Sequence, residues 1–211
     1  MCISICGKVL LVSACLMAGT AVWSQQSQKP ALPAATAGVS ADVAVSFAAE
    51  QSETVPGQCC FWFKGGGADA AVTFWKGFGI AASLTGDTAS NVAPGVDVNK
   101  IGYLAGPRYT WTAWRAAHQP RYQIFAQGLF GGAHGFDGLY PAGSGSAASA
   151  NAFALETGGG LNLFVTPHFG LRLIEADYVR TAFPNAAGDE QNDLRLSVGL
   201  VYHRTGAVSQ R

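Results

Sequence analysis

The residues best suited to hydrolytic chemistry lie in one segment rich in glycine, serine and alanine. His134 and Asp137 share this segment with Ser144, Ser146 and Ser149. A serine nucleophile needs a base within hydrogen-bond reach and a third group that orients the base. The residue types are present, but their spacing does not predict that geometry. We therefore expect a flexible, solvated loop here and no catalytic residue.

Metal and cofactor sites have no better support. His118, His168 and His203 are too scattered along the chain to predict a metal site. Two runs of three glycines, at 65–67 and 158–160, lack the strand, turn and helix context of a phosphate-binding loop. In the second run, close backbone approach or sheet curvature is the better explanation. We expect neither a metal nor a cofactor.

Two adjacent cysteines, Cys59 and Cys60, lie outside the leader described below. Their Cα atoms would be about 3.8 Å apart, which is below the usual disulfide range of about 4.4 to 6.8 Å. A disulfide between them would be strained, and no further metal ligands lie nearby. We assign these two thiols no role.

The elements that must position any site are β-strands, because eight segments alternate apolar and polar residues. In the last segment, every second residue from Leu194 to Tyr202 is large and apolar. Periodicity alone does not say whether such a face meets lipid or a protein core. The predicted strands are Ser40–Glu50, Asp69–Phe74, Phe78–Asp87, Ile101–Trp111, Arg121–Gly132, Phe153–Phe164, Phe169–Thr181 and Asp193–Tyr202.

The connections between these strands alternate in length and composition. Four are long and rich in Gly, Ser, Asn and Asp, at residues 51–66, 88–100, 134–151 and 184–192. The others are shorter and flanked by aromatic residues, although the one at 112–120 is long for its kind. Up-and-down barrels of the outer membrane have this pattern of connections, with long loops on the outside and short turns facing the periplasm. The sequence therefore predicts an all-β fold, an eight-stranded antiparallel up-and-down transmembrane β-barrel.

Aromatic residues near the short turns would lie at one height in such a barrel. A girdle of this kind is expected at a membrane interface, where amphipathic rings prefer to sit. The alternative is that the rings close one end of the core of a β-sandwich. The residues are Trp75, Phe78, Trp111, Trp114, Tyr122, Phe164, Phe169 and Tyr202.

Charged residues of both signs fall on the faces that would point into the barrel. Eight strands enclose a space just wide enough for side chains to fill, and charges withdrawn from water are costly unless they are paired. We therefore expect a structural network of mutually compensating charges that plugs the interior. Its members are Glu50, Asp69, Arg108, Glu156, Arg172, Glu175 and Arg195.

Two positions break the alternation. In the strand at 169–181, strict alternation would put Arg172 inside but Glu175 and Asp177 toward lipid. We predict a bulge between Arg172 and Glu175 that brings Glu175 inside. Pro107 cannot donate a ladder hydrogen bond, and a barrel has no free edge to hide that loss. We predict a bulge or another local irregularity at Pro107.

Composition limits the location and the partners. Charged residues are 12% of the 211-residue chain and glycines number 27, which suits bent sheets that face lipid. Lys+Arg and Asp+Glu balance at 13 each, so we expect no nucleic-acid partner. Lys8 and the apolar run that follows it predict a cleaved signal peptide over 1–24. An uncleaved anchor or lipidation at Cys15 is less well supported. A flexible lead-in over 25–38 would precede the barrel domain at 39–211.

Four stretches of the chain carry a family resemblance: residues 104–109 (LAGPRY), 125–134, 171–178 and 191–199. On these stretches the chain resembles the eight-stranded outer-membrane β-barrel family of OmpA-like transmembrane type, particularly its short, single-domain acidobacterial members. The resemblance implies the outer membrane of a Gram-negative-type bacterium. It implies outer-membrane lipid, lipopolysaccharide and the barrel-insertion machinery as partners. No peptidoglycan-binding domain follows the barrel segment, and the final residue is not the usual aromatic.

The resemblance says little about activity, and the His-x-Ser arrangement of lipid A deacylase barrels is missing. We expect a small, non-enzymatic outer-membrane barrel with a structural or surface-interaction role, with its four long loops as the contact surface. The alternatives are a narrow pore, an envelope-lipid-modifying barrel enzyme and a soluble ligand-binding barrel of the lipocalin kind. The sequence does not identify the surface partner.

Overall fold

The structure of the protein is a computed structural model that describes residues 38–52, 61–93, 96–116, 119–142, 145–185 and 189–206. The predicted signal peptide, nearly all of the predicted lead-in, and Cys59 and Cys60 lie outside these residues. Within them, no helix is long and apolar enough to cross a membrane. The strands are β1 (Ser40–Ser52), β2 (Phe61–Trp75), β3 (Phe78–Ala93), β4 (Val96–Ala116), β5 (Gln119–Ala142), β6 (Gly145–Phe164), β7 (Phe169–Thr181) and β8 (Gln191–Thr205).

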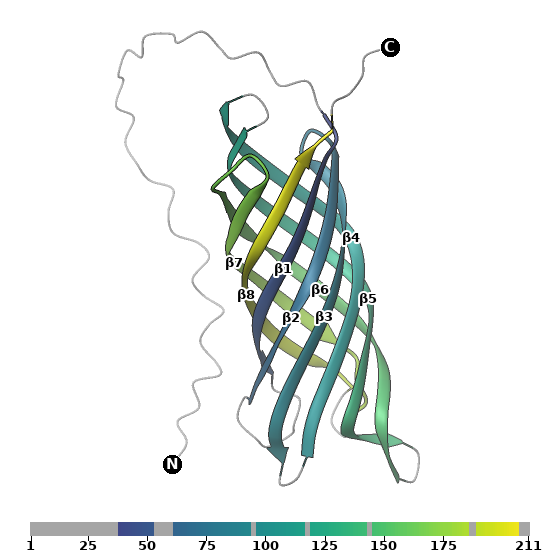
Figure 1. Cartoon of the computed structure of the whole chain (residues 1–211). Coiled ribbons are helices and arrows are strands. Elements are labelled where there is room, and N and C mark those ends of the chain that lie inside the picture. The colour runs from purple at the N-terminus through teal and green to yellow at the C-terminus, as the bar shows by residue number, and fades with distance from the viewer. Residues whose placement is uncertain are drawn as a thin grey trace, which may run out of the picture. The chain divides into compact units, whose positions relative to one another are not determined.

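The eight strands of the described chain close into one antiparallel barrel in which each strand pairs with its neighbours in sequence order (Figure 1). The first and last strands complete the cylinder, because β1 pairs with β8 from Ser40↔Thr205 to Gln51↔Leu194. Closure leaves no strand edge with a row of unpaired backbone groups. The predicted fold class is confirmed.

The two ends of the barrel differ in their connections. At the terminal end, uppermost in Figure 1, β1 begins, β8 ends, and β2–β3, β4–β5 and β6–β7 are joined. Lys76 and Gly77 make the first of these turns with φ angles of 46° and 92°. The N–H groups of Val165 and Thr166 donate to the carbonyl of Phe169 in the turn after β6. The opposite, distal end holds the connections β1–β2, β3–β4, β5–β6 and β7–β8.

The predicted long loops at 88–100 and 134–151 are wrong, because most of these residues are paired strand. The β3–β4 ladder continues from Asp87↔Lys100 to Ala89↔Val98, and the β5–β6 ladder runs on past His134. Gly, Ser, Asn and Asp favour turns, but here ladder partners on neighbouring strands outweigh that local preference. The predicted turn at 112–120 is also shorter than expected, since β4 and β5 extend into it.

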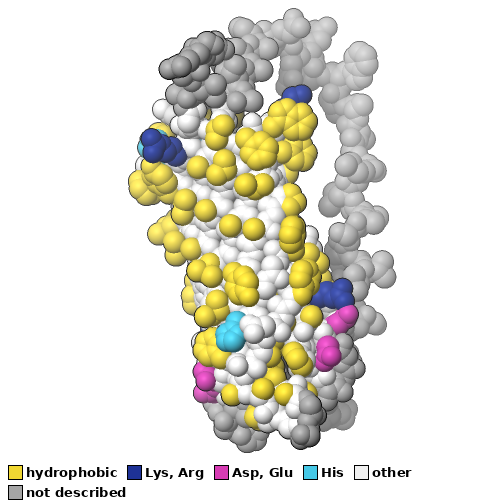
Figure 2. All heavy atoms as spheres, turned by 90° about the vertical axis from the view of Figure 1, so that its right-hand side faces the viewer, with side chains coloured by type: hydrophobic (Ala, Val, Ile, Leu, Met, Phe, Trp, Pro, Cys, Tyr) yellow, Lys and Arg dark blue, Asp and Glu magenta, His cyan; other side chains and the backbone are white. Residues whose placement is uncertain are grey.

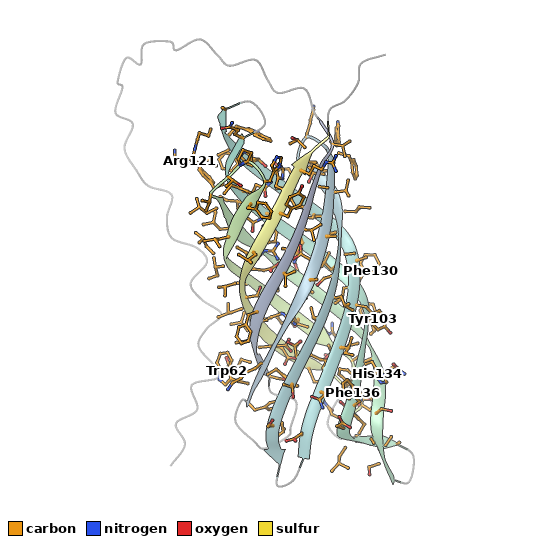
Figure 3. The ribbon with its side chains drawn as sticks, viewed as in Figure 1. Trp62, Tyr103, Arg121, Phe130, His134 and Phe136 are labelled. Carbon is orange, nitrogen blue, oxygen red and sulfur yellow. The ribbon has the colours of Figure 1, made fainter. Side chains whose placement is uncertain are left out.

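The outer wall of the barrel is apolar along every strand. The side chains of Val45, Phe47, Ile80, Phe130 and Leu200 are each between 58% and 66% exposed. Phe130 on β5 and Tyr103 on β4 point away from the barrel in Figure 3. On the face in Figure 2, hydrophobic side chains spread over the middle, and the charged ones lie nearer the two ends. The period-two alternation therefore sorts large apolar groups outward.

A bulge in β7 lies where the sequence predicts it. The ladder with β6 skips Leu173, and the ladder with β8 shifts between Arg172 and Glu175. One extra residue reverses the facing of everything after it. Glu175 and Asp177 therefore join Arg172 inside and are only 6% and 2% exposed.

The predicted irregularity at Pro107 is confirmed as a break in pairing. The β4–β5 ladder pairs Ala105 with Phe130 and Arg108 with Gln127, but the two positions between are unpaired in that ladder. The register is the same on both sides of the break, so β4 contains no extra residue at this point. The ring of Pro107 faces outward. Its missing N–H affects the ladder with β5 only, since Pro107 still pairs with Ile80 of β3.

Aromatic rings surround the terminal end, as predicted. Ring centroids are 4.9 Å apart for Phe78 and Tyr109, and 5.3 Å apart for Phe169 and Tyr202. The inclusion of Phe164 in this girdle is wrong, because its side chain is 2% exposed and points into the barrel. Side chains two positions apart on a strand point to the same face, and Phe164 lies two positions after Asn162, which faces inward.

Candidate functional site

All seven residues of the predicted interior network point into the barrel and are buried. Six of them contact a side chain of opposite charge, while Glu156 contacts only an amide. They belong to two groups: a central cluster around two arginines and a distal cluster closer to the distal end. The buried residues are Glu50, Asp69, Arg108, Glu156, Arg172, Glu175 and Arg195.

The central cluster is built on Arg172 and Arg108. Arg172 Nη1 donates to Asp69 Oδ1 at 2.5 Å and to Glu175 Oε2 at 2.7 Å. Arg108 Nη1 donates to the other oxygen of Asp69 at 3.0 Å. The cluster therefore joins β2, β4 and β7 across the barrel. The bulge in β7 is what places Glu175 within reach of Arg172.

One aromatic ring contacts both guanidinium groups. The centroid of Phe125 lies 4.4 Å from Arg108 Cζ and 4.9 Å from Arg172 Cζ, which are cation–π distances. The space for this ring comes from Gly160 on β6, where a Cβ atom would lie only 2.8 Å from the ring. At Gly159, a Cβ would lie 2.2 Å from the carbonyl oxygen of Phe125. Close approach therefore accounts for glycine at both positions.

Gln127 connects Arg108 to three carboxylates. Its Oε1 accepts from Arg108 Nε at 2.9 Å. Its Nε2 faces Glu156, Glu175 and Asp177 at 3.3, 3.1 and 3.4 Å. An amide that accepts on one side and donates on the other can link a cation to anions that lie out of the cation's reach.

The distal cluster contains two cations and three carboxylates. Lys100 Nζ donates to Glu50 and lies 3.9 Å from Asp193 Oδ2. Arg195 Nη1 donates to Asp87 Oδ2 at 2.8 Å and to Glu50 Oε2 at 3.5 Å. All five side chains are buried.

A chain of polar contacts leads from the central cluster to the terminal end. Arg172 Nε donates to Asn162 at 3.3 Å, and Asn162 donates to Gln123 at 3.4 Å. Gln123 faces His203, whose Nδ1 lies 2.6 Å from Asp42 Oδ1. The ring centroid of His203 lies 5.4 Å from that of Phe164, which forms a small buried apolar cluster with Ala44 and Val201.

Carboxylates outnumber cations inside the barrel. Among the described residues, eight buried carboxylates face four buried lysines and arginines. The predicted mutual compensation of charge therefore holds only for the carboxylates that contact a lysine or an arginine. The carboxylates are Asp42, Glu50, Asp69, Asp87, Glu156, Glu175, Asp177 and Asp193, and the cations are Lys100, Arg108, Arg172 and Arg195.

The barrel opens at the distal end into a pocket of about 250 Å³. Apolar and aromatic side chains form its walls, and polar side chains of the distal cluster lie at its buried end. Phe183, in the segment after β7, is held in place because its N–H donates to Gln191 Oε1 and its carbonyl accepts from Gln191 Nε2, each at 2.9 Å. The lining includes Phe63, Val98, Lys100, Tyr140, Phe183 and Asp193.

Among the described residues, His134 and Asp137 hydrogen-bond to asparagines and do not form a triad with Ser146 or Ser149. His134 lies near the distal end (Figure 3) with its Nδ1 2.8 Å from Asn151 Oδ1. Asp137 accepts a hydrogen bond from Asn99 at 2.8 Å. Ser144 lies outside the described residues. Within the described part of the chain, no group of three or more His, Cys, Asp or Glu residues is arranged to hold a metal ion.

No protein-family model matches the chain, and no curated protein matches it. The solved structures that resemble it include two with a TM-score above 0.5. One is Ail, the attachment invasion locus protein of Yersinia pestis, in complex with the heparin analogue sucrose octasulfate. It has a TM-score of 0.52 and 17% identity over 79% of this chain and 99% of that chain. The other, Neisserial surface protein A (NspA), has a TM-score of 0.53 and 14% identity over 78% of this chain and 96% of that chain. The chain has the eight-stranded outer-membrane β-barrel fold.

Within this eight-stranded outer-membrane β-barrel fold, sequence reasoning missed several interior residues. The sequence analysis places Lys100 in a predicted loop, but extending the alternation of Ile101 and Tyr103 backward turns it inward. Asp177 follows from the same bulge that was predicted for Glu175. Nothing in the local sequence singles out Gln127 as the amide that contacts three carboxylates. The other missed residues are Asp42, Asp87, Asp193 and His203.

Proposed function

We propose that the protein is a small outer-membrane β-barrel of a Gram-negative-type bacterium, with a structural or surface-interaction role and no catalytic activity. The observation that carries this proposal is the outer wall, where each of the eight described strands exposes large apolar side chains. A soluble protein seldom exposes a continuous apolar surface of that extent. Acyl chains would cover it without the cost of ordering water.

The proposed orientation follows from the connections. Short turns of outer-membrane barrels face the periplasm, so the terminal end would face the periplasm and the distal end the outside. The aromatic rings around the terminal end would then sit at the inner interface of the membrane. Outer-membrane lipid and lipopolysaccharide would contact the wall, and the barrel-insertion machinery would assemble it.

The surface role would belong to the distal end. The three longest strands, β4, β5 and β6, form part of this end. Ail is crystallised with a polysulfated heparin analogue, but binding of a polyanion does not carry over to this surface. The exposed charges described near the distal end are mainly acidic: Lys64 and Arg180 against Asp97, Asp137, Asp189 and Glu190. We therefore propose partners recognised by hydrogen bonds and apolar contacts.

The test is electrophoresis of the full-length protein in mild detergent before and after boiling, together with fractionation of the cells that produce it. A folded barrel should migrate differently from its boiled form, and the protein should be recovered with the outer membrane. Recovery in the soluble fraction without detergent would contradict the proposal. Lipid A of unchanged mass in cells with and without the protein is the expected result for a non-enzymatic barrel.

A further inference from the structure

Four basic side chains form a rim at the terminal end of the barrel, and all four are exposed. One lies in the β2–β3 turn, one near the end of β4, one near the start of β5 and one near the end of β8. The ion pairs of the described residues all belong to other cations. This basic rim consists of Lys76, Arg115, Arg121 and Arg204.

No exposed carboxylate of the described chain lies at this end. Asp42, which also lies at the terminal end, is buried and contacts His203. On the face in Figure 2, Asp and Glu side chains appear only toward the distal end. The charge of the basic rim is therefore free to meet an anionic partner. The exposed carboxylates are Asp97, Asp137, Asp189 and Glu190.

Each cation of the basic rim lies beside an aromatic residue of the girdle. In every pair, the cation is one or two residues nearer to the turn or to the end of the strand than the ring is. A strand rises about 3.3 Å per residue, so the cation lies a few ångströms further toward water. The pairs are Lys76 with Trp75, Arg115 with Trp114, Arg121 with Tyr122, and Arg204 with Tyr202.

This order of ring and cation matches the layers of a membrane interface. Trp and Tyr rings prefer the boundary between acyl chains and headgroups, and the charged ends of long basic side chains extend from there toward water. With the girdle at that boundary, the basic rim lies at the level of the lipid phosphates. A partner dissolved in the periplasm would require exposed cations but no ring beside each of them.

We propose that the basic rim binds the phosphate groups of anionic phospholipids in the leaflet around the terminal end. In the orientation proposed above, this is the inner leaflet of the outer membrane. The inference rests on the proposed function, because it requires the barrel to span a membrane. It adds the class of lipid that gathers at one end.

The test is tryptophan fluorescence of the full-length protein, folded in phosphatidylcholine vesicles that contain a minor fraction of a brominated lipid. This lipid is either phosphatidylglycerol or phosphatidylcholine, and its brominated acyl chains quench the tryptophans that they contact. Replacement of Trp23 and Trp62 by Phe leaves three reporters, all at the terminal end: Trp75, Trp111 and Trp114.

Phosphatidylglycerol should be enriched beside these reporters by about fivefold, which is the gain expected from one Lys or Arg near an anionic surface. The enrichment should disappear in about 1 M salt, where the Debye length is only about 3 Å. Equal quenching by the two lipids at low salt would overturn the inference and point instead to a partner in the water.

Variants identify the groups responsible. Lys76→Gln combined with Arg115→Gln removes the cations beside two of the reporters and should bring the lipid ratio back toward that of the bilayer. Lys64→Gln combined with Arg180→Gln is the matched control, because it removes one exposed lysine and one exposed arginine near the distal end, and it should leave the enrichment unchanged. An enrichment that survives the loss of Lys76 and Arg115 would contradict the proposal.

Two further readouts keep the result decisive. If the variant at the basic rim does not fold, an enrichment that persists in about 1 M salt in the unaltered rim would still contradict the proposal. Quenching by brominated phosphatidylcholine tests the membrane assignment separately, because rings that never meet acyl chains would be quenched by neither lipid. Failure of this inference and failure of the proposed function therefore give different results.

Discussion

Arg172 is the residue whose contacts reach furthest through the barrel interior. It contacts carboxylates on β2 and on its own strand, and it also contacts Asn162 and the ring of Phe125. Its side chain is almost fully buried, so no water takes the place of these partners. Removal of one partner from a buried ion pair leaves the other charge unpaired, which costs more than the pair itself contributes.

Substitution of Arg172 by Met should therefore be strongly destabilising, because Asp69 and Glu175 lose their main cationic partner. We expect the free energy of unfolding to fall by about 3 to 5 kcal/mol, measured by denaturant titration of the detergent-folded protein. Arg180→Met is the matched control, since Arg180 is exposed and pairs with Glu190 on the surface. It should change stability by less than about 1 kcal/mol. Equal effects of the two substitutions would contradict the central role of Arg172.

The excess of carboxylates makes the opposite prediction for Glu156. This side chain is buried and contacts the amide of Gln127 rather than a cation. Glu156→Gln removes an uncompensated charge and retains an oxygen that can accept from that amide. We expect the free energy of unfolding to rise by about 1 kcal/mol at pH 8. Glu175→Gln, which takes a partner from Arg172, should lower it in the same titration, and a loss of stability in both variants would contradict this distinction.

At the scale of the element, β7 shows how one residue decides the chemistry of the interior. The extra residue near Leu173 reverses the facing of the strand beyond it, and two carboxylates turn inward as a result. Without the bulge, these carboxylates would face acyl chains, and Arg172 would lose its partner on the same strand. The bulge is therefore required to reconcile the sequence of β7 with a membrane-facing wall.

Deletion of Ala176, beyond the bulge, should prevent the barrel from folding, because a shift of one residue would turn Asp177 to the outer wall. A charged residue on the lipid face of a barrel costs up to about 2 to 4 kcal/mol, depending on depth and on the residue. The measurement is the fraction of protein that migrates as the folded form before boiling. Deletion of Leu173 is the matched control, because it removes the residue that β6 leaves unpaired and keeps Glu175 and Asp177 inside, so this variant should still fold. A folded Ala176 deletion, or an unfolded Leu173 deletion, would contradict this account of the bulge.

At the scale of the whole molecule, the interior is filled along its length. The polar contacts run from Asp42 near the terminal end, through the central arginines, to Asp193 below the distal pocket. An eight-stranded barrel is narrow enough for side chains to occupy its interior completely. The described structure therefore has a pocket at one end and a packed, charged core between that pocket and the other end.

A filled interior predicts that the protein does not conduct ions. In planar lipid bilayers, the folded protein should give no steady single-channel openings, because the network offers no continuous water-filled path. The control is electrophoresis of the same preparation before boiling. It shows that the protein is folded, so that an absence of openings reflects a closed barrel and not an unfolded one. Steady openings from folded protein would contradict a plugged interior.

The amino-acid sequence by itself determined the fold class, the start of most strands, the facing of their side chains and the bulge in β7. These properties follow from local alternation, because successive side chains of a strand point to opposite faces and a misplaced carboxylate marks the position that breaks the rule. The inward facing of the seven predicted network residues follows from the same regularity.

Only the tertiary structure decided which charges meet, how far the strands extend, and where the pocket lies. Arg172 and Asp69 are 103 residues apart in the chain, and their contact depends on the registers of all the strands between them. The extension of β3 to β6 through segments with the composition of loops depends on ladder partners that local sequence does not reveal. Contacts between distant strands require closure of the barrel, so their pairing is a property of the closed cylinder and not of any single segment.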